Sequence, residues 1–161
     1  MSWNFETVVG PLGTLTEGPA WDGSGILFTH IRKNRILRYN PQTRKTTLFK
    51  ENTNEANGLM FDDQGHLYAC EGAGRRIVRY ETNESVTTLA DEFNGNRLNS
   101  PNDLAIDRSG RIWFTDPRYG DRSNMELDHD SVFRLDPEPD GSNSMKRVTY
   151  DTTRPNGILL S

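Results

Sequence analysis

The chain has 161 residues, of which 33% are hydrophobic and 26% charged, and its formal net charge is −4. This composition is typical of a soluble globular protein. The acidic balance excludes non-specific nucleic-acid binding, because no basic face can dominate. No stretch is apolar for long enough to form a transmembrane helix, so we expect neither a nucleic acid nor a membrane as partner.

The N-terminal sequence and the cysteine content bear on the compartment. Residues 1–13 lack a basic segment followed by an apolar run, so no signal peptide is readable. Cys70 is the only cysteine, which excludes an intrachain disulfide and favours a reducing compartment. We therefore expect a cytoplasmic protein, with a periplasmic or secreted location as the alternative.

A repeated unit organises the chain. Its copies start at Glu17-Gly18, Asn57-Gly58, Asn102-Asp103 and Asn156-Gly157. In the first three copies a short apolar run leads to a glycine, and an alternating run follows. These glycines are Gly25, Gly65 and Gly110. Because glycine readily adopts the positive φ of a tight turn, each of these starts predicts a β-hairpin.

Each copy predicts four strands in chain order. The first copy places them at residues 17–22, 26–29, 34–39 and 46–49. The second copy places them at residues 57–62, 66–69, 75–80 and 86–89. The third copy places them at residues 102–107, 111–114, 130–135 and 146–149. A polar insertion at 117–129 lengthens the third copy, with one turn of helix expected around 125–127, and a strand of the fourth copy begins at 156–159.

Four strands in a unit of about 40–50 residues are typical of a β-propeller blade. We therefore expect an all-β fold, a single partial β-propeller domain of four-stranded antiparallel blades over residues 1–161, with an open antiparallel sandwich as the alternative. The repeats provide about three and a half blades, whereas propellers typically close with about 4–8. The chain is accordingly expected to be an N-terminal portion that ends within its fourth blade. An open blade edge favours self-association or the assembly of two chains into one ring.

The first position of each copy carries an oxygen-bearing side chain. These residues are Glu17, Asn57, Asn102 and Asn156. Equivalent positions of successive blades surround one axis, so we expect these side chains to converge at one mouth of the central channel. Carboxylate and amide oxygens are hard ligands that suit calcium or magnesium. The alternative is that each asparagine serves only a local turn.

Six motifs carry a resemblance to a known family. They are Glu17-Gly18-Pro19-Ala20-Trp21, Ala56-Asn57-Gly58-Leu59, Ala69-Cys70-Glu71-Gly72, Arg97-Leu98-Asn99-Ser100-Pro101-Asn102-Asp103-Leu104, Trp113-Phe114-Thr115-Asp116-Pro117-Arg118-Tyr119-Gly120 and Arg154-Pro155-Asn156-Gly157. From about Thr16 to Ser161 the chain resembles the senescence marker protein/gluconolactonase family (regucalcin-like lactonases), especially its bacterial gluconolactonase branch. The resemblance implies a six-bladed propeller with one divalent cation in its channel, calcium first, with zinc, magnesium or manganese as alternatives.

The resemblance also implies roles for particular residues. The matched metal ligands are Glu17, Asn102 and Asn156. The matched substrate contacts are Asn57, Asn99 and Arg97. In the family an aspartate of a later blade is both a metal ligand and the candidate base. That aspartate is expected beyond Ser161, so no catalytic residue is assigned within the chain.

The function implied by the resemblance is metal-dependent hydrolysis of a small sugar lactone, such as gluconolactone, or of a related ester. The cation would polarise the carbonyl, and a carboxylate would accept the proton of the attacking water. Asp103 is expected to point to the opposite side of its strand from Asn102, so it is not assigned as that carboxylate. The alternative is a catalytically inactive fragment, or a non-enzymatic propeller module that binds calcium or a partner.

Overall fold

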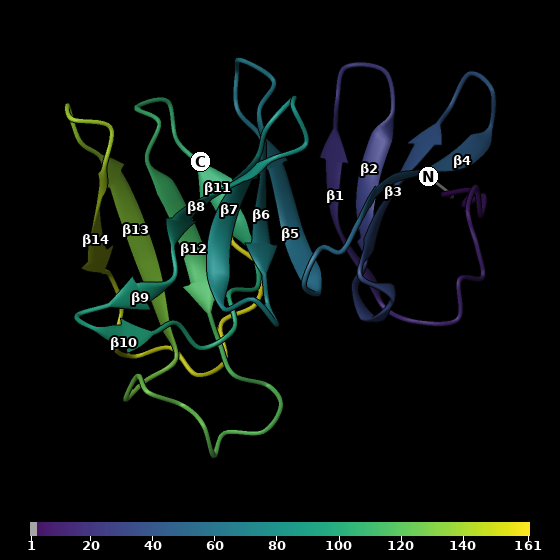
Figure 1. Cartoon of the computed structure of the whole chain (residues 1–161). Helices are drawn as coiled ribbons and strands as arrows, with labels where there is room; N and C mark the ends of the chain where they lie inside the picture. Colours follow the sequence, from purple (N-terminus) through teal and green to yellow (C-terminus); the bar gives the residue numbers. More distant parts are fainter. Residues whose placement is uncertain (1–2) are drawn as a thin grey trace.

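A computed structural model describes residues 3–161 of the chain. Over this range the chain forms three four-stranded antiparallel sheets, a two-stranded hairpin and one short 3-10 turn (Figure 1). The predicted all-β class and the four-stranded units are confirmed. Across the same residues, no helix has the length and hydrophobicity needed to cross a membrane.

Each sheet is built from strands in sequence order. The first contains β1 (Thr16–Trp21), β2 (Ile26–His30), β3 (Arg35–Asn40) and β4 (Lys45–Glu51), with the 3-10 turn η1 (Ile31–Lys33) after β2. The second contains β5 (Ala56–Phe61), β6 (Leu67–Glu71), β7 (Arg76–Tyr80) and β8 (Val86–Ala90). The third contains β11 (Leu104–Ile106), β12 (Ile112–Asp116), β13 (Ser131–Pro137) and β14 (Asn143–Arg147). The hairpin β9 (Glu92–Phe93) and β10 (Asn96–Arg97) connects the second sheet to the third.

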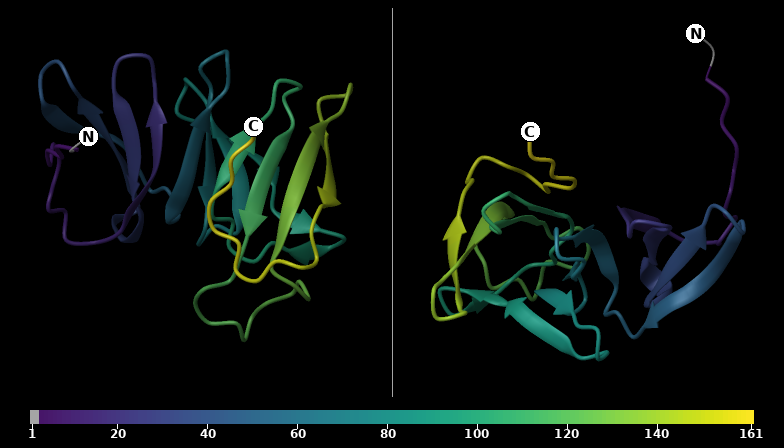
Figure 2. Two further views of the ribbon diagram at one scale, coloured as in Figure 1. Left: turned by 180° about the vertical axis from the view of Figure 1, so that it is seen from behind. Right: turned by 90° about the horizontal axis from the view of Figure 1, so that it is seen from above.

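The first strands of the three sheets lie next to one another. β5 contacts β1 on one side and β11 on the other, and each sheet extends outward from there (Figure 2). The sheets therefore stand beside each other like propeller blades, with the starts of their first strands at a shared inner edge. This arrangement places the first position of every repeat in one region, as the periodicity predicts.

Gly58 explains how closely the inner strands approach. A Cβ at Gly58 would lie 2.7 Å from Asp103 Cα and 2.9 Å from Asn102 O, so no side chain fits there. The Gly58 amide instead donates to Asn102 O at 2.8 Å. The glycine of the repeat motif thus allows a direct backbone contact between two neighbouring blades.

Two apolar clusters fill the spaces between adjacent blades. Between the first and second blades lie Ala20, Leu27, Ile36, Ala56, Leu59, Leu67, Ala69, Val78 and Tyr80. Between the second and third lie Cys70, Ile77, Leu98, Leu104, Ile112, Phe114, Leu127, Phe133 and Leu135. Alternate residues of the strands contribute to these clusters, since side chains of a strand alternate between its two faces. Burying a large apolar side chain contributes about 1.5–3 kcal/mol, so these clusters hold the blades together.

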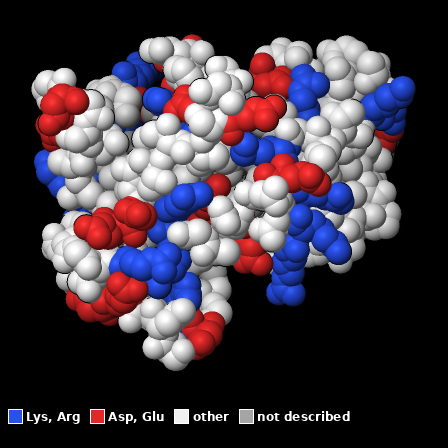
Figure 3. Space-filling view, in the orientation of Figure 1, with Lys and Arg blue, Asp and Glu red and all other residues white. Residues whose placement is uncertain are grey.

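Charged residues cover the blade surfaces with both signs interspersed, as one face of the molecule shows (Figure 3). The arginines that recur in the third strand of each unit pair with acidic neighbours. The pairs are Arg38–Asp22 at 2.5 Å, Arg79–Glu81 at 2.8 Å and Arg134–Asp136 at 2.6 Å. These repeated arginines therefore form ion pairs on the blade surface, at the same position of each blade.

The third unit departs from its predicted elements. β14 begins at Asn143, before the expected start at 146, because Met145 pairs with Leu135 and Asn143 with Pro137 across a short hairpin. The turn of helix expected around 125–127 is absent from the described structure. Leu127 instead packs into the second apolar cluster, so this segment lies against the blades.

Residues 156–159 do not form the predicted strand. The Ile158 amide donates to Asp103 Oδ2 at 3.1 Å, where a strand would donate to the backbone of a neighbour. Among the described residues, no strand pairs with this segment. A side chain of the third blade therefore holds the segment in place of a sheet ladder.

Candidate functional site

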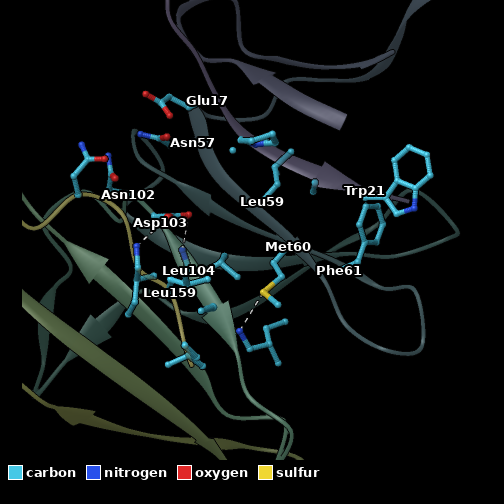
Figure 4. Close-up of a pocket in the computed structure, with 18 residues that line it drawn as sticks. Glu17, Trp21, Asn57, Leu59, Met60, Phe61, Asn102, Asp103, Leu104 and Leu159 are labelled. Atoms are coloured by element: carbon cyan, nitrogen blue, oxygen red, sulfur yellow. Dashed lines mark hydrogen bonds between the residues drawn. The ribbon is translucent and has the colours of Figure 1, made fainter. Parts of the chain in front are cut away.

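The first positions of the four repeats line one cavity of about 580 Å³. They are Glu17, Asn57, Asn102 and Asn156. Glu17, Asn57 and Asn102 lie at one end of this cavity, whereas the aromatic side chains of Trp21 and Phe61 lie at the other (Figure 4). The inner edge of the blades therefore presents a polar end and an apolar end to one space.

Irregular pairing marks the two inner strands that carry Glu17 and Asn57. The register of β1 with β2 shifts between Glu17 and Ala20, and that of β5 with β6 shifts between Ala56 and Leu59. Such a bulge bends a strand and redirects its side chains, and bulges are common beside functional sites. A bulge therefore lies at the first position of two successive blades.

The side chains at the polar end are not used by the fold. Glu17 is exposed, Asn57 is half-buried and Asn102 is 7% exposed. Within residues 3–161, none of these three side chains makes a hydrogen bond or an ion pair with another residue. Their oxygens are therefore available to a ligand, and carboxylate with amide oxygens fits a hard divalent cation.

Asn156 is held differently from the other three. Its backbone oxygen accepts Thr115 Oγ1 at 2.6 Å, and its Nδ2 donates to Tyr119 Oη at 3.0 Å. Because the amide nitrogen is used by Tyr119, Oδ1 is the atom that remains for a ligand. Tyr119 comes from the insertion at residues 117–129, and its contact with Asn156 is not predicted by the repeat.

Asp103 lines the same cavity, which differs from the expectation that it points away from Asn102. Its Oδ1 accepts the Leu104 amide at 2.9 Å and its Oδ2 accepts the Ile158 amide at 3.1 Å. Burial raises the pKa of this carboxyl, although the two backbone amides oppose the shift. Asp103 therefore joins the third blade to the segment that carries Asn156.

Neither of the other two predicted substrate contacts, Asn99 and Arg97, lines the cavity. Asn99 is fully buried, and its Nδ2 donates to Asp116 O and His129 O, both at 3.2 Å. Asn99 Oδ1 is buried without a hydrogen-bond partner in the described chain. Arg97 is exposed on β10, with Nη2 at 3.5 Å from Gly74 O.

A buried arginine supports the loop that carries these residues. Arg75 donates from Nε to Leu98 O at 2.5 Å and from Nη2 to Arg97 O at 3.2 Å. Its Nη1 lies 3.2 Å from Glu126 Oε1 in the insertion. The repeat does not predict this role, because it places Arg75 only at the start of a strand and pairs it with nothing in the insertion.

The donor set has one carboxylate. No group of three His, Cys, Asp or Glu side chains within residues 3–161 is arranged to hold a metal ion. The candidate ligands differ from such a group because amide oxygens accompany Glu17. Amide oxygens add no formal charge, so these residues supply one negative charge to a bound cation.

Blade-like four-stranded sheets around a shared cavity define a protein of the β-propeller type. The SMP-30/Gluconolactonase/LRE-like region family matches residues 15–161, and the chain belongs to this family. The gluconolactonase of Zymomonas mobilis subsp. mobilis is 29% identical over 166 residues, which cover 91% of this chain and 46% of that relative.

Solved structures show the same similarity. A gluconolactonase from Xanthomonas campestris is 33% identical with a TM-score of 0.77, covering 84% of this chain and 47% of that chain. Virginiamycin B lyase from Staphylococcus aureus shares the fold alone, at 18% identity and a TM-score of 0.65, covering 94% of this chain and 47% of that chain. The chain spans about half the length of the relatives it matches.

Proposed function

We propose that the chain is part of a metal-dependent hydrolase of sugar lactones, similar to gluconolactonase, or of related esters. Membership of the family and the gluconolactonases among its relatives support this reaction class. Coverage of about half of each relative supports the further proposal that the chain is a portion of a longer propeller, and the resemblance of its motifs implies the N-terminal portion of a six-bladed one. The three sheets would then be complete blades, with residues 156–161 at the start of a fourth.

One observation carries the proposal. Oxygen-bearing side chains from the first positions of four repeats line one cavity, and the side chains of Glu17, Asn57 and Asn102 make no hydrogen bond within the described chain. A fold that needed these groups only for turns would use their hydrogen-bonding capacity locally. We propose that Glu17, Asn102 and Asn156 hold a divalent cation, with calcium the first choice for oxygen ligands.

In the proposed reaction the cation and the side chains of the protein would have different roles. A bound divalent cation would supply positive charge that polarises the lactone carbonyl and stabilises the oxyanion of the tetrahedral intermediate. Asn57, at the same end of the cavity as Glu17 and Asn102, would orient the substrate through its amide group. Asn99 and Arg97 are retained as proposed substrate contacts from the adjoining loop.

We assign no general base among the described residues. Apart from Glu17, which is a proposed metal ligand, Asp103 is the carboxylate of the cavity wall, but both of its oxygens accept backbone amides. Proton transfer needs a group within hydrogen-bonding distance of the attacking water, and a carboxylate already used by two amides is a poor acceptor. The aspartate that the family provides is proposed to lie in a later blade.

Replacement of Asn102 by alanine tests the site. We expect Asn102→Ala to weaken binding of Ca²⁺ by the chain at least about tenfold, since a polar contact to a charged group is worth about 1.5–3 kcal/mol. Isothermal titration calorimetry measures the affinity. Asn143→Ala, in the outer strand β14, serves as the matched control, because the Asn143 side chain makes no hydrogen bond with any of residues 3–161.

The outcomes separate the two functions considered. Equal Ca²⁺ affinity of Asn102→Ala and the unmodified chain would remove the assigned site. Ca²⁺ binding together with gluconolactone hydrolysis, measured as the acid released at constant pH, would support the hydrolase. Ca²⁺ binding without hydrolysis would favour the alternative of a calcium-binding module for the chain taken alone.

A further inference from the structure

Two buried carboxylates occupy equivalent positions in the second and third blades. Glu71 is the last residue of β6 and Asp116 the last residue of β12, and their exposed fractions are 1% and 0%. Neither residue lines the candidate cavity. Burying a carboxylate is costly unless hydrogen bonds satisfy it, so each needs a structural or functional reason.

Asp116 binds the loop that enters its own blade. Its Oδ2 accepts the Asn99 amide and its Oδ1 accepts the Ser100 amide, both at 2.8 Å. Its backbone oxygen accepts Asn99 Nδ2 at 3.2 Å. Two residues after Ser100, the Asn102 amide donates to Thr115 O at 2.9 Å. The end of β12 therefore fixes the whole approach to Asn102.

Glu71 binds the corresponding loop of the second blade. Its Oε2 accepts Asn54 Nδ2 at 2.8 Å and Arg76 Nε at 2.7 Å, and its Oε1 accepts Tyr80 Oη at 2.9 Å. Asn54 precedes Asn57 by the same number of residues as Asn99 precedes Asn102. The two carboxylates thus hold their loops at the same distance before a cavity asparagine.

The first blade shows that the fold does not require a carboxylate at this position. The equivalent residue there is His30, the last residue of β2, which is buried and accepts Arg35 Nε on its Nδ1 at 3.1 Å. The next residue, Ile31, donates its amide to Leu15 O at 3.2 Å. In the second blade the residue after the carboxylate makes a similar bond, from the Gly72 amide to Glu55 O at 3.3 Å. In the third blade that residue is Pro117, which has no amide hydrogen, so the Asp116 side chain holds the loop directly.

We infer that Asp116 and Glu71 are positioning residues, which fix the entry loops so that Asn102 and Asn57 keep their places in the cavity wall. For Asp116 the functional consequence rests on the proposed function, because Asn102 is a proposed cation ligand. Both carboxylates act through their loops and touch neither the cation nor the substrate. They restrict the position of a site residue, and a displacement of about 1 Å of such a residue can greatly reduce its contribution to binding or catalysis.

Asp116→Asn tests this inference with little change of shape. An amide has one acceptor oxygen, so one of the two backbone amides at Asn99 and Ser100 would face an N–H₂ group. We expect hydrogen exchange of the Asn99, Ser100 and Asn102 amides to accelerate at least about tenfold, which corresponds to about 1.4 kcal/mol. We expect Ca²⁺ affinity of the chain to fall at least about fivefold.

Asp107→Asn is the matched control. Asp107 Oδ1 accepts the Ser109 and Arg111 amides at 2.8 and 3.1 Å, in the turn at the other end of the same blade. This variant also removes a carboxylate that binds two backbone amides, but it leaves the Asn99–Asn102 loop untouched. We expect it to lower stability while Ca²⁺ affinity and exchange at Asn102 stay unchanged.

Glu71→Gln provides a second variant should Asp116→Asn fail to fold. It replaces the carboxylate that accepts Asn54 Nδ2 and Arg76 Nε by an amide, which has a single acceptor oxygen. We therefore expect amide exchange at Ala56 to accelerate. Ca²⁺ affinity is expected to stay within about twofold, because Asn57 is not a proposed cation ligand. The Ala56 amide, which donates to Thr53 O at 2.9 Å, reports on this loop. Unchanged exchange at Ala56 in Glu71→Gln, or at Asn102 in Asp116→Asn, would overturn the inference.

The two proposals fail in different ways. If the unmodified chain binds no Ca²⁺, the proposed metal site fails, and amide exchange alone decides whether the carboxylates position their loops. If the chain binds Ca²⁺ and Asp116→Asn accelerates exchange without weakening binding, the link from Asp116 to the site is overturned. Accelerated exchange with weakened binding, both absent from Asp107→Asn, is the result that the inference expects.

Discussion

Asp107 shows how a single residue secures a turn of this fold. In addition to two backbone amides, it accepts Arg111 Nε at 2.6 Å and Trp113 Nε1 at 3.1 Å on its Oδ2. Partial burial raises the pKa of the carboxyl, but these hydrogen bonds outweigh burial and hold the pKa of Asp107 at about 2. The folded chain therefore favours the charged form more strongly than the unfolded chain does.

This low pKa predicts how the effect of Asp107→Asn depends on pH. A folded pKa below the ordinary value of 3.8 stabilises the fold above about pH 4, and the contribution is lost as the pH falls towards about 2. We expect the variant to lower the free energy of unfolding by about 1–2 kcal/mol near neutral pH, with a smaller loss near the folded pKa. Urea unfolding of the variant and the unmodified chain, near neutral pH and near pH 2, measures these free energies. An equal loss of stability at the two pH values would contradict the stabilising role of the charged Asp107 carboxylate.

At the scale of elements, the contact between β5 and the start of the third blade depends on Gly58. We expect Gly58→Ala to destabilise the chain by about 1–3 kcal/mol, because the new methyl group would overlap the backbone at Asn102 and Asp103. Gly120→Ala is the control, since a Cβ there meets nothing within 4 Å. Thermal unfolding of both variants checks the prediction, and equal midpoints would show that the blades do not meet closely at Gly58.

The elements also show what sequence could and could not predict. The hairpins β1–β2 and β5–β6 lie close to their predicted ranges, because glycine turns and alternating apolar residues specify them locally. The predicted strand at 156–159 is absent because a strand needs a pairing partner, and the described chain provides Asp103 in its place. The pairing of β14 is likewise set by its neighbour β13, which local pattern does not reveal.

At the scale of the whole molecule, the repeat predicted that the candidate ligand side chains lie around one space. Glu17, Asn57, Asn102 and Asn156 line one cavity because equivalent positions of neighbouring blades share an inner edge. The repeat could not predict the contact of Asn156 with Tyr119. That contact joins residues far apart in the sequence through an irregular insertion, whose path depends on tertiary packing and not on periodicity.

The central claim is that the inner edge of these blades binds a divalent cation through Glu17 and the asparagine oxygens. Calorimetric titration of the chain and of Glu17→Gln with Ca²⁺ tests it most directly, because this variant keeps the shape of the side chain and removes the only carboxylate of the proposed set. We predict binding to the unmodified chain and an affinity at least about tenfold weaker in Glu17→Gln, in line with the value of a charge-assisted contact. Equal affinities, or no binding by the unmodified chain, would contradict it.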